Sequence, residues 1–218
     1  MFETVARKKG ETMTLKSEPI KTIKKIVIFF DICSSTSILE DLIRTENEQL
    51  WRNFLIEFKN YLWGKRFSVG FEMYKFLGDG WILLLDPQSE GMEIFQLLEK
   101  LSDKFVSLYR RHIRNVLTTR IATIGLTFGM DIGSCIKFKM NKRLEYVGRP
   151  LNVAGRLQDA IGQRDKKPQN KGLVSRNLYA TFADQRKIKR KYTILRVRRQ
   201  LKNISGGEDY RCLKVKLK

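Results

Sequence analysis

The sequence contains few cysteines, a single histidine and no long apolar run. Its three cysteines, Cys33, Cys135 and Cys212, are an odd number without CxxC spacing, which argues against both a disulfide framework and a zinc site. No apolar run approaches the roughly 20 residues that a membrane-spanning helix requires. Residues 1–25 lack the apolar segment of a secretory signal. We therefore expect a reduced, cytoplasmic protein without a membrane span.

Acidic residues are scarce relative to basic ones. The chain has 43 Lys and Arg against 23 Asp and Glu, so its formal net charge is +20. Such a charge attracts polyanions (nucleoside triphosphates, nucleic acid or an anionic membrane) without choosing among them. The basic residues cluster toward the C-terminus, at 186–192, 196–202 and 214–218. The length of 218 residues and the apolar content of 42% suit one domain with a tail, or two small domains.

The residue pattern in the first part of the sequence predicts an arm, a strand and a long helix. Residues 1–24 are polar and basic, and we expect a flexible or loosely docked arm before a domain that spans residues 25–218. The domain opens with an apolar run that ends at Asp31 and suits a buried strand. Helical spacing of apolar residues over 34–63, with one polar gap, predicts a long amphipathic helix. The candidates for its N-cap are Ser34, Ser35 and Thr36.

Two apolar runs meet at Gly78-Asp79-Gly80. This arrangement predicts a β-hairpin, because glycine tolerates the positive φ that tight turns need. A second amphipathic helix is predicted over residues 91–113.

The remaining elements complete a mixed fold. We expect two strands within residues 120–138, broken at Gly129 and Gly133, then a short helix over 148–161 with Pro150 near its first turn. Basic strands end the chain. The order of elements predicts an α+β sandwich of ferredoxin-like type, with an antiparallel-rich sheet and its helices on one face.

Two carboxylates are candidates for a metal site. In such a fold the first strand is central and the hairpin lies beside it, so Asp31 and Asp79 would converge at one sheet edge. Paired carboxylates there would suit Mg²⁺ or Mn²⁺, and the helix start just after Asp31 would offer free N–H groups to phosphate. The alternatives stay open at this point: Asp79 as a turn residue only, and Asp31 as a helix-capping residue.

Asn152 and Arg156 are a second candidate pair. Four residues apart on a helix, they project from one face. They form either a solvated polar stripe or a functional pair, in which Arg156 neutralises charge that grows on a phosphate and Asn152 fixes a ribose.

Four motifs together resemble the catalytic domain of class III nucleotide cyclases. They are "FFDICSST", "YKFLGDG", "LTFGMDIG" and "EYVGRPLNVAGRLQ", in the order and at about the spacing of that family. The resemblance covers residues 25–160 and thins after residue 165. It implies that Asp31 and Asp79 bind two Mg²⁺ or Mn²⁺ ions per site, with the main-chain carbonyl of Ile32 as a further contact.

The same resemblance implies the substrate contacts. The segment that wraps the triphosphate would be Cys33, Ser34, Ser35 and Thr36. Lys75 and Glu145 match the two base-reading positions, and Asn152 and Arg156 match the pair that stabilises the transition state. Lys202, where the alignment is loose, matches a lysine that binds the terminal phosphates.

The implied reaction is attack of the ribose 3′-oxygen on the α-phosphorus, with pyrophosphate as the leaving group. Family members are head-to-tail dimers with sites built across the interface. A homodimer would then take Asp31 and Asp79 from one chain, and Lys75, Glu145, Asn152 and Arg156 from the other.

Counting hydrogen-bond donors and acceptors does not identify the nucleotide base that the site would recognise. Lys75 only donates and ionised Glu145 only accepts, and adenine, cytosine, uracil and guanine can each meet that pair. Glu145 stands where adenylate cyclases commonly have aspartate, and its extra methylene favours a smaller base. "KFLGDGWILLL" and "GRPLNVAGRLQDAI" resemble the stand-alone cyclases of bacterial Pycsar antiphage systems, which make cyclic UMP or cyclic CMP for a separate effector protein. This resemblance implies UTP, or CTP, as substrate.

Two rival interpretations remain. A class III adenylate cyclase would keep every catalytic residue and differ only in the base pocket. A palm-like nucleic-acid-binding protein would also hold two aspartates on a ferredoxin-like sheet, and the charge of +20 suits a phosphate backbone. A palm domain, however, does not need Asn152 and Arg156 at helical spacing. We therefore expect no stable complex with nucleic acid.

Overall fold

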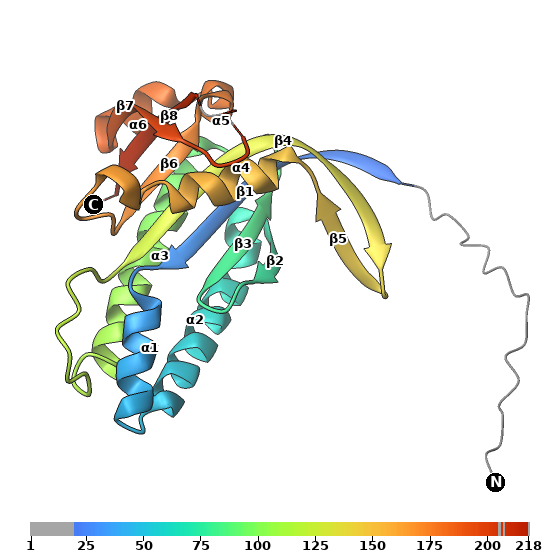
Figure 1. Ribbon diagram of the computed structural model, residues 1–218. Helices are drawn as coiled ribbons and strands as arrows, with labels where there is room; N and C mark the ends of the chain where they lie inside the picture. The colour runs from blue at the N-terminus through green and yellow to red at the C-terminus, as the bar shows by residue number, and fades with distance from the viewer. Residues whose placement is uncertain (1–19, 205, 207, 218) are drawn as a thin grey trace, which may run out of the picture.

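The computed structural model describes residues 20–204, 206 and 208–217, and these residues build one mixed sheet covered by helices (Figure 1). The strands are β1 (Lys21–Ile32), β2 (Phe71–Phe76), β3 (Gly80–Leu85), β4 (Leu126–Met140), β5 (Arg143–Val147), β6 (Lys171–Ser175), β7 (Thr193–Gln200) and β8 (Asp209–Lys216). The helices are α1 (Ser35–Arg44), α2 (Glu48–Val69), α3 (Gly91–His112), α4 (Arg149–Asp159), the 3₁₀ turn η1 (Gly162–Arg164), α5 (Arg176–Thr181) and α6 (Gln185–Lys191).

The sheet has the order β2-β3-β1-β4-β6-β8-β7, and β5 pairs with β4 outside this path. The β4–β6 pair is parallel, whereas the other pairings described are antiparallel. The predicted α+β fold with an antiparallel-rich sheet is confirmed, and β1 has the expected central place, between β3 and β4.

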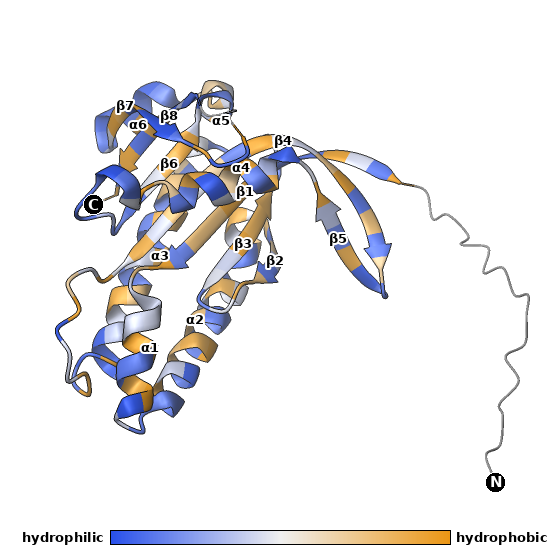
Figure 2. Ribbon diagram, viewed as in Figure 1, coloured by the Kyte–Doolittle hydropathy of each residue, from blue (hydrophilic) through white to orange (hydrophobic). Residues whose placement is uncertain are grey.

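Side chains alternate along β1 between two cores, as the period of a strand requires. Ile26, Ile28 and Phe30 belong to the larger core, which α2 and α3 cover. Val27 belongs to a smaller cluster with Ala154 of α4, on the opposite face. One helix therefore departs from the expected one-sided arrangement, because α4 packs against β4 and β1 from the other side. Figure 2 shows the apolar residues concentrated in the middle of the sheet.

The predicted long helix over residues 34–63 is wrong in one respect: it is two helices. α1 ends at Arg44 and α2 begins at Glu48. Between them Glu46 has a φ of 55°, and the Asn47 side chain donates to the Thr45 carbonyl at 2.7 Å. Short polar side chains here offer the backbone an alternative to the helical ladder, which ends the helix.

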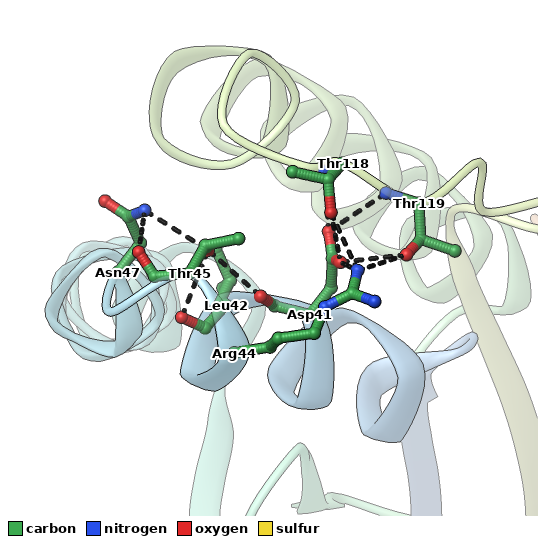
Figure 3. Close-up of polar contacts among 7 residues, drawn as sticks. All are labelled: Asp41, Leu42, Arg44, Thr45, Asn47, Thr118 and Thr119. Atoms are coloured by element: carbon green, nitrogen blue, oxygen red, sulfur yellow. Dashed lines mark hydrogen bonds and ion pairs between the residues drawn. The ribbon is translucent and has the colours of Figure 1, made fainter.

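Asp41 anchors the end of α1 to the loop after α3 (Figure 3). Its buried carboxylate accepts hydrogen bonds from the backbone N–H of Thr118 at 2.7 Å and of Thr119 at 3.2 Å, and from both hydroxyls. Arg44 also donates to it. The hydrogen bond from the Thr118 side chain is the largest of the causes that hold the pKa of Asp41 well below its usual range.

The predicted break at Gly129 and Gly133 is also wrong, because β4 runs unbroken through both glycines. A Cβ at Gly129 would lie 2.0 Å from the Ala154 carbonyl oxygen and 2.3 Å from the Gln158 nitrogen. Gly129 therefore lets the backbone of α4 lie directly on the strand, which is a packing role that a turn signal does not reveal.

Three further features agree with the predictions. The hairpin of β2 and β3, the helix α3 and the short helix α4 with Pro150 in its first turn are all confirmed. β1 begins at Lys21, inside the expected arm, whereas residues 1–19 lie outside the described part of the chain. No helix within the described ranges combines the length and apolarity needed to cross a membrane.

Candidate active site

The hairpin tip brings Asp79 to the end of β1. Asp31 pairs with Gly80 in the β1–β3 ladder, so Asp79 lies one residue beyond Asp31's partner. Ser35, in the first turn of α1, donates its hydroxyl to an Asp79 carboxylate oxygen. The two aspartates, which lie 48 positions apart in the sequence, therefore meet where α1 begins. The expected convergence of Asp31 and Asp79 is confirmed.

Steric constraints explain both glycines of the turn, Gly78 and Gly80. Gly78 has a φ of 100°, and the Leu77 N–H donates to the Gly80 carbonyl at 2.9 Å to close the hairpin. A Cβ at Gly80 would lie 2.3 Å from the Phe30 carbonyl oxygen and 3.0 Å from Oδ1 of Asp31. The absence of a side chain at Gly80 thus gives Asp31 its room.

The electrostatics of the pair favour a cation. Burial first, then the negative charge of Asp79 and a hydrogen bond with it, raise the pKa of Asp31 from 3.8 to about 7. A half-buried carboxylate beside a second carboxylate binds a proton more tightly because ionisation leaves two like charges together. A divalent cation would relieve the same repulsion.

The donor set fits Mg²⁺ or Mn²⁺. Both ions prefer oxygen ligands, and Mg²⁺ commonly takes one or two carboxylates together with substrate phosphates and water. No cluster of three or more His, Cys, Asp or Glu side chains that could hold a metal occurs in the ranges described. Asp31 and Asp79 would hold the metal, and Ile32, the last residue of β1, follows directly with its backbone carbonyl.

The segment from Cys33 to Thr36 turns into α1 without the expected side-chain cap. Ser34 is the N-cap residue, with a φ of 58°, and it makes no side-chain capping bond. Ser35 donates to Asp79 instead, and the Cys33 N–H donates to the Gly125 carbonyl at 2.9 Å. Burial and the negative charge of Asp31 raise the pKa of Cys33 to about 12, so its thiol stays protonated.

A hollow of about 290 Å³ lies beside this segment. Cys33 and Ser34 line one side of it, and Thr127, which faces Asp31 in the β1–β4 ladder, lines another. Gln158 and Asp159 of α4 complete the wall. The hollow therefore adjoins the aspartate pair and the start of α1, where free backbone N–H groups favour an anion.

Asn152 and Arg156 are both exposed on α4, one helical turn apart. Arg156 donates to Asp159 at 3.2 Å. Across the described ranges, neither residue makes a hydrogen bond or an ion pair with Asp31 or Asp79. No hydrogen bond or ion pair therefore joins these two pairs directly in the described part of the chain, although, after burial and Asp79, the charge of Asp159, the partner of Arg156, contributes to the raised pKa of Asp31.

Lys75 and Glu145 meet within one chain. Nζ of Lys75 lies 2.8 Å from Oε2 of Glu145, and this hydrogen bond is the largest cause of the lowered pKa of Glu145. Tyr74 donates its hydroxyl to the same carboxylate oxygen at 2.6 Å. The β2–β3 register shifts between Met73 and Lys75, so the bulge at Tyr74 directs two neighbouring side chains to Glu145.

Sequence reasoning missed the tyrosines that support this pair. The Tyr146 N–H donates to the Tyr74 hydroxyl at 3.1 Å, and the Tyr146 hydroxyl donates to Glu72 at 2.9 Å. The two rings pack edge to face with centroids 5.1 Å apart. The only sequence signal was their adjacency to Lys75 and Glu145. Lys202 lies in the exposed connection after β7, and within the described residues it makes no hydrogen bond or ion pair with the aspartates.

The fold matches solved nucleotide cyclases. No protein-family model and no curated protein matches the sequence. The adenylyl cyclase CyaB from P. aeruginosa is 20% identical with a TM-score of 0.65, over 91% of this chain and 96% of that chain. The guanylyl cyclase Cya2 is 15% identical with a TM-score of 0.67, over 90% and 93%. A monomeric adenylate cyclase from Trypanosoma brucei is 16% identical with a TM-score of 0.62, over 89% and 88%.

These likenesses define the class of fold. At such identities they show the architecture alone, and that architecture is the one of class III cyclase catalytic domains. The fold expected from the four motifs is thereby confirmed.

Proposed function

We propose that this protein is a nucleotide cyclase that converts a pyrimidine nucleoside triphosphate into its 3′,5′-cyclic monophosphate and pyrophosphate. The observation that carries the proposal is the meeting of Asp31 and Asp79 at the start of α1, with the pKa of Asp31 raised to about 7 by burial and by Asp79. The motifs around both residues and the fold of the domain agree with that chemistry.

Each part of the site has a role in the proposed reaction. Bound Mg²⁺ or Mn²⁺ would supply Lewis-acid activation of the ribose 3′-oxygen and neutralise phosphate charge. Asp31 and Asp79 hold that charge in place, with the Ile32 carbonyl beside them. The backbone from Cys33 to Thr36 cradles the triphosphate, and Lys202 pairs with its terminal phosphates.

The second half of the site would come from a second copy of the chain. Asn152 orients the ribose and Arg156 stabilises charge on the α-phosphate in the transition state. A head-to-tail homodimer would bring both residues to the partner's aspartates. Exposed apolar side chains on β4, β5 and the hairpin tip are candidates for the surface that such a dimer would cover, since contiguous exposed apolar surface indicates an interface. They are Phe76, Leu77, Ile136, Met140, Leu144 and Val147.

Uracil is the favoured base, with cytosine next. Tyr74 and Lys75 each donate a hydrogen bond to one oxygen of Glu145. At a base-reading position, the extra methylene of glutamate would narrow the pocket and favour a smaller base. The likeness of "KFLGDGWILLL" and "GRPLNVAGRLQDAI" to Pycsar cyclases supports the same choice. The product would then be a second messenger in antiphage defence, read by a separate effector protein.

The test is direct. The purified protein is incubated with Mn²⁺ and, separately, with ATP, GTP, CTP or UTP, and the products are identified by mass. The Asp79→Ala variant is the control, because it removes one carboxylate from a half-buried position in the turn. Cyclic UMP or cyclic CMP from the wild type alone supports the proposal. Cyclic AMP would keep the mechanism and overturn the pyrimidine assignment. No product together with a mobility shift of plain DNA or RNA would favour the nucleic-acid alternative.

A further inference from the structure

A second concave region lies at the far edge of the sheet from the aspartates. It has a volume of about 670 Å³ and is bounded by α5, α6, β7 and β8, which cluster together in Figure 1. This volume lies within the range of about 300–1,000 Å³ typical of small-molecule pockets. None of its lining residues belongs to the candidate active site, so we refer to it as the basic hollow.

Five cationic side chains line the basic hollow: Arg176, Lys189, Arg196, Arg198 and Arg211. They come from four different elements, α5, α6, β7 and β8. Among the residues that the structure describes, none of the five forms an ion pair with a carboxylate. Their positive charges are therefore available to a ligand.

The β7–β8 ladder brings like charges together. Arg198 and Arg211 are direct partners in the antiparallel register, and Arg196 lies two residues along on the same face. Like charges directly opposite each other destabilise a sheet. The sequence thus carries a local electrostatic cost here that an anion would remove.

A buried tyrosine lies in the wall of the basic hollow. Tyr179 lines the basic hollow and is 7% exposed, and its hydroxyl has no hydrogen-bond partner in the described structure. Burial and then the charge of Asp184 raise the pKa of Tyr179, so the hydroxyl keeps its proton. Oδ2 of Asp184 itself accepts from the Met92 N–H at 2.8 Å. The Tyr179 hydroxyl is buried beneath the hollow, so the five cations supply the binding groups of the hollow.

We propose that the basic hollow binds a small ligand that carries several phosphate groups. Guanidinium groups bind phosphate through paired hydrogen bonds, and arginine is favoured wherever that geometry is used. The concave shape and the volume of about 670 Å³ favour a small oligophosphate over a nucleic-acid strand, which would lie along an open surface. The proposal is independent of the cyclase activity.

The experiment uses inorganic tripolyphosphate as the probe, titrated calorimetrically into the full chain with EDTA present. The test variant combines Arg196→Gln, Arg198→Gln and Arg211→Gln. The control variant combines Arg52→Gln, Lys59→Gln and Lys100→Gln, three exposed residues of α2 and α3, and loses the same net charge.

We expect the test variant to bind tripolyphosphate at least tenfold more weakly, which corresponds to about 1.4 kcal/mol, and the control variant to stay within twofold of the wild type.

Three results would overturn the proposal. Equal losses in the test and control variants would mean attraction by net charge alone. A loss caused by Lys202→Gln, which leaves the three arginines in place, would place the anion at the candidate active site instead. Tight binding of a DNA or RNA oligonucleotide that depends on the three arginines, without binding of tripolyphosphate, would make the hollow part of a nucleic-acid surface.

Discussion

The substitution Asp79→Asn separates a metal-binding carboxylate from a plain turn residue. Asparagine keeps an oxygen that can accept from Ser35 but removes the negative charge that faces Asp31. In the wild type, the folded-state pKa of Asp31 is about 7 against an ordinary value of 3.8. Because this pKa is raised, ionising Asp31 costs stability progressively from about pH 4 to pH 7, and the full cost is present above pH 7.

The size of the effect follows from the shift. A shift of about three units is worth about 4 kcal/mol at 1.36 kcal/mol per unit. Burial accounts for the largest single share, and the charge and hydrogen bond of Asp79 follow. Assigning half of the shift to Asp79 gives a gain of about 2 kcal/mol for Asp79→Asn at pH 8. At pH 5 Asp31 is protonated in both folded proteins, and the difference should vanish.

Urea unfolding at pH 5 and pH 8, with and without Mn²⁺, measures both consequences. Asp103→Asn, an exposed position on α3, is the matched control and should change stability by less than about 0.5 kcal/mol. At an Mn²⁺ concentration 100 times its dissociation constant the wild type should gain about 2.7 kcal/mol, and Asp79→Asn should gain much less. Equal stabilisation of both proteins by Mn²⁺ would refute the assignment of Asp79 as a metal ligand.

Three further predictions test the fold and the composite site. Gly80→Ala should lower the free energy of unfolding by about 1–3 kcal/mol, as overpacking does, and should abolish activity. Gly64→Ala is the control, because its Cβ meets nothing within 4 Å, and it should not lower that free energy. Urea unfolding measures the stability and product formation measures the activity. Mixing inactive Asp31→Ala and Arg156→Ala chains should restore part of the activity, and no rescue in confirmed mixed dimers would contradict the shared site. Since the pKa of Asp41 is lowered, its stabilising effect should fade as pH falls below about 4, so Asp41→Asn should show a smaller loss of melting temperature from pH 5 to pH 3 than the wild type.

The sequence predicted the aspartate pair because local signals and topology agreed. An Asp-Gly turn between apolar runs indicates a hairpin, and an apolar run that ends in Asp31 indicates a central strand. The unbroken course of β4 through Gly129 could not be predicted, because this position must be glycine to make room for the backbone of α4, a helix that follows later in the chain. The bulge at Tyr74 could not be predicted either, since it is defined only by the pairing of β2 with β3. Contacts between distant segments determine both features, whereas residue patterns indicate only local conformational preference.

The charge near the aspartate pair differs from the net charge of the chain. The chain carries a net charge of +20, yet the pKa of Asp31 is raised, with burial and then Asp79 as the main causes. A general positive charge does not compensate for this, because exposed charges beyond about 8 Å are largely screened at physiological salt. The five cations of the basic hollow lie across the sheet, on β7, β8, α5 and α6, beyond β4 and β6 in the strand order. The two carboxylates therefore favour a cation at the site itself, and their oxygen donors suit the hard divalent metal that we propose there.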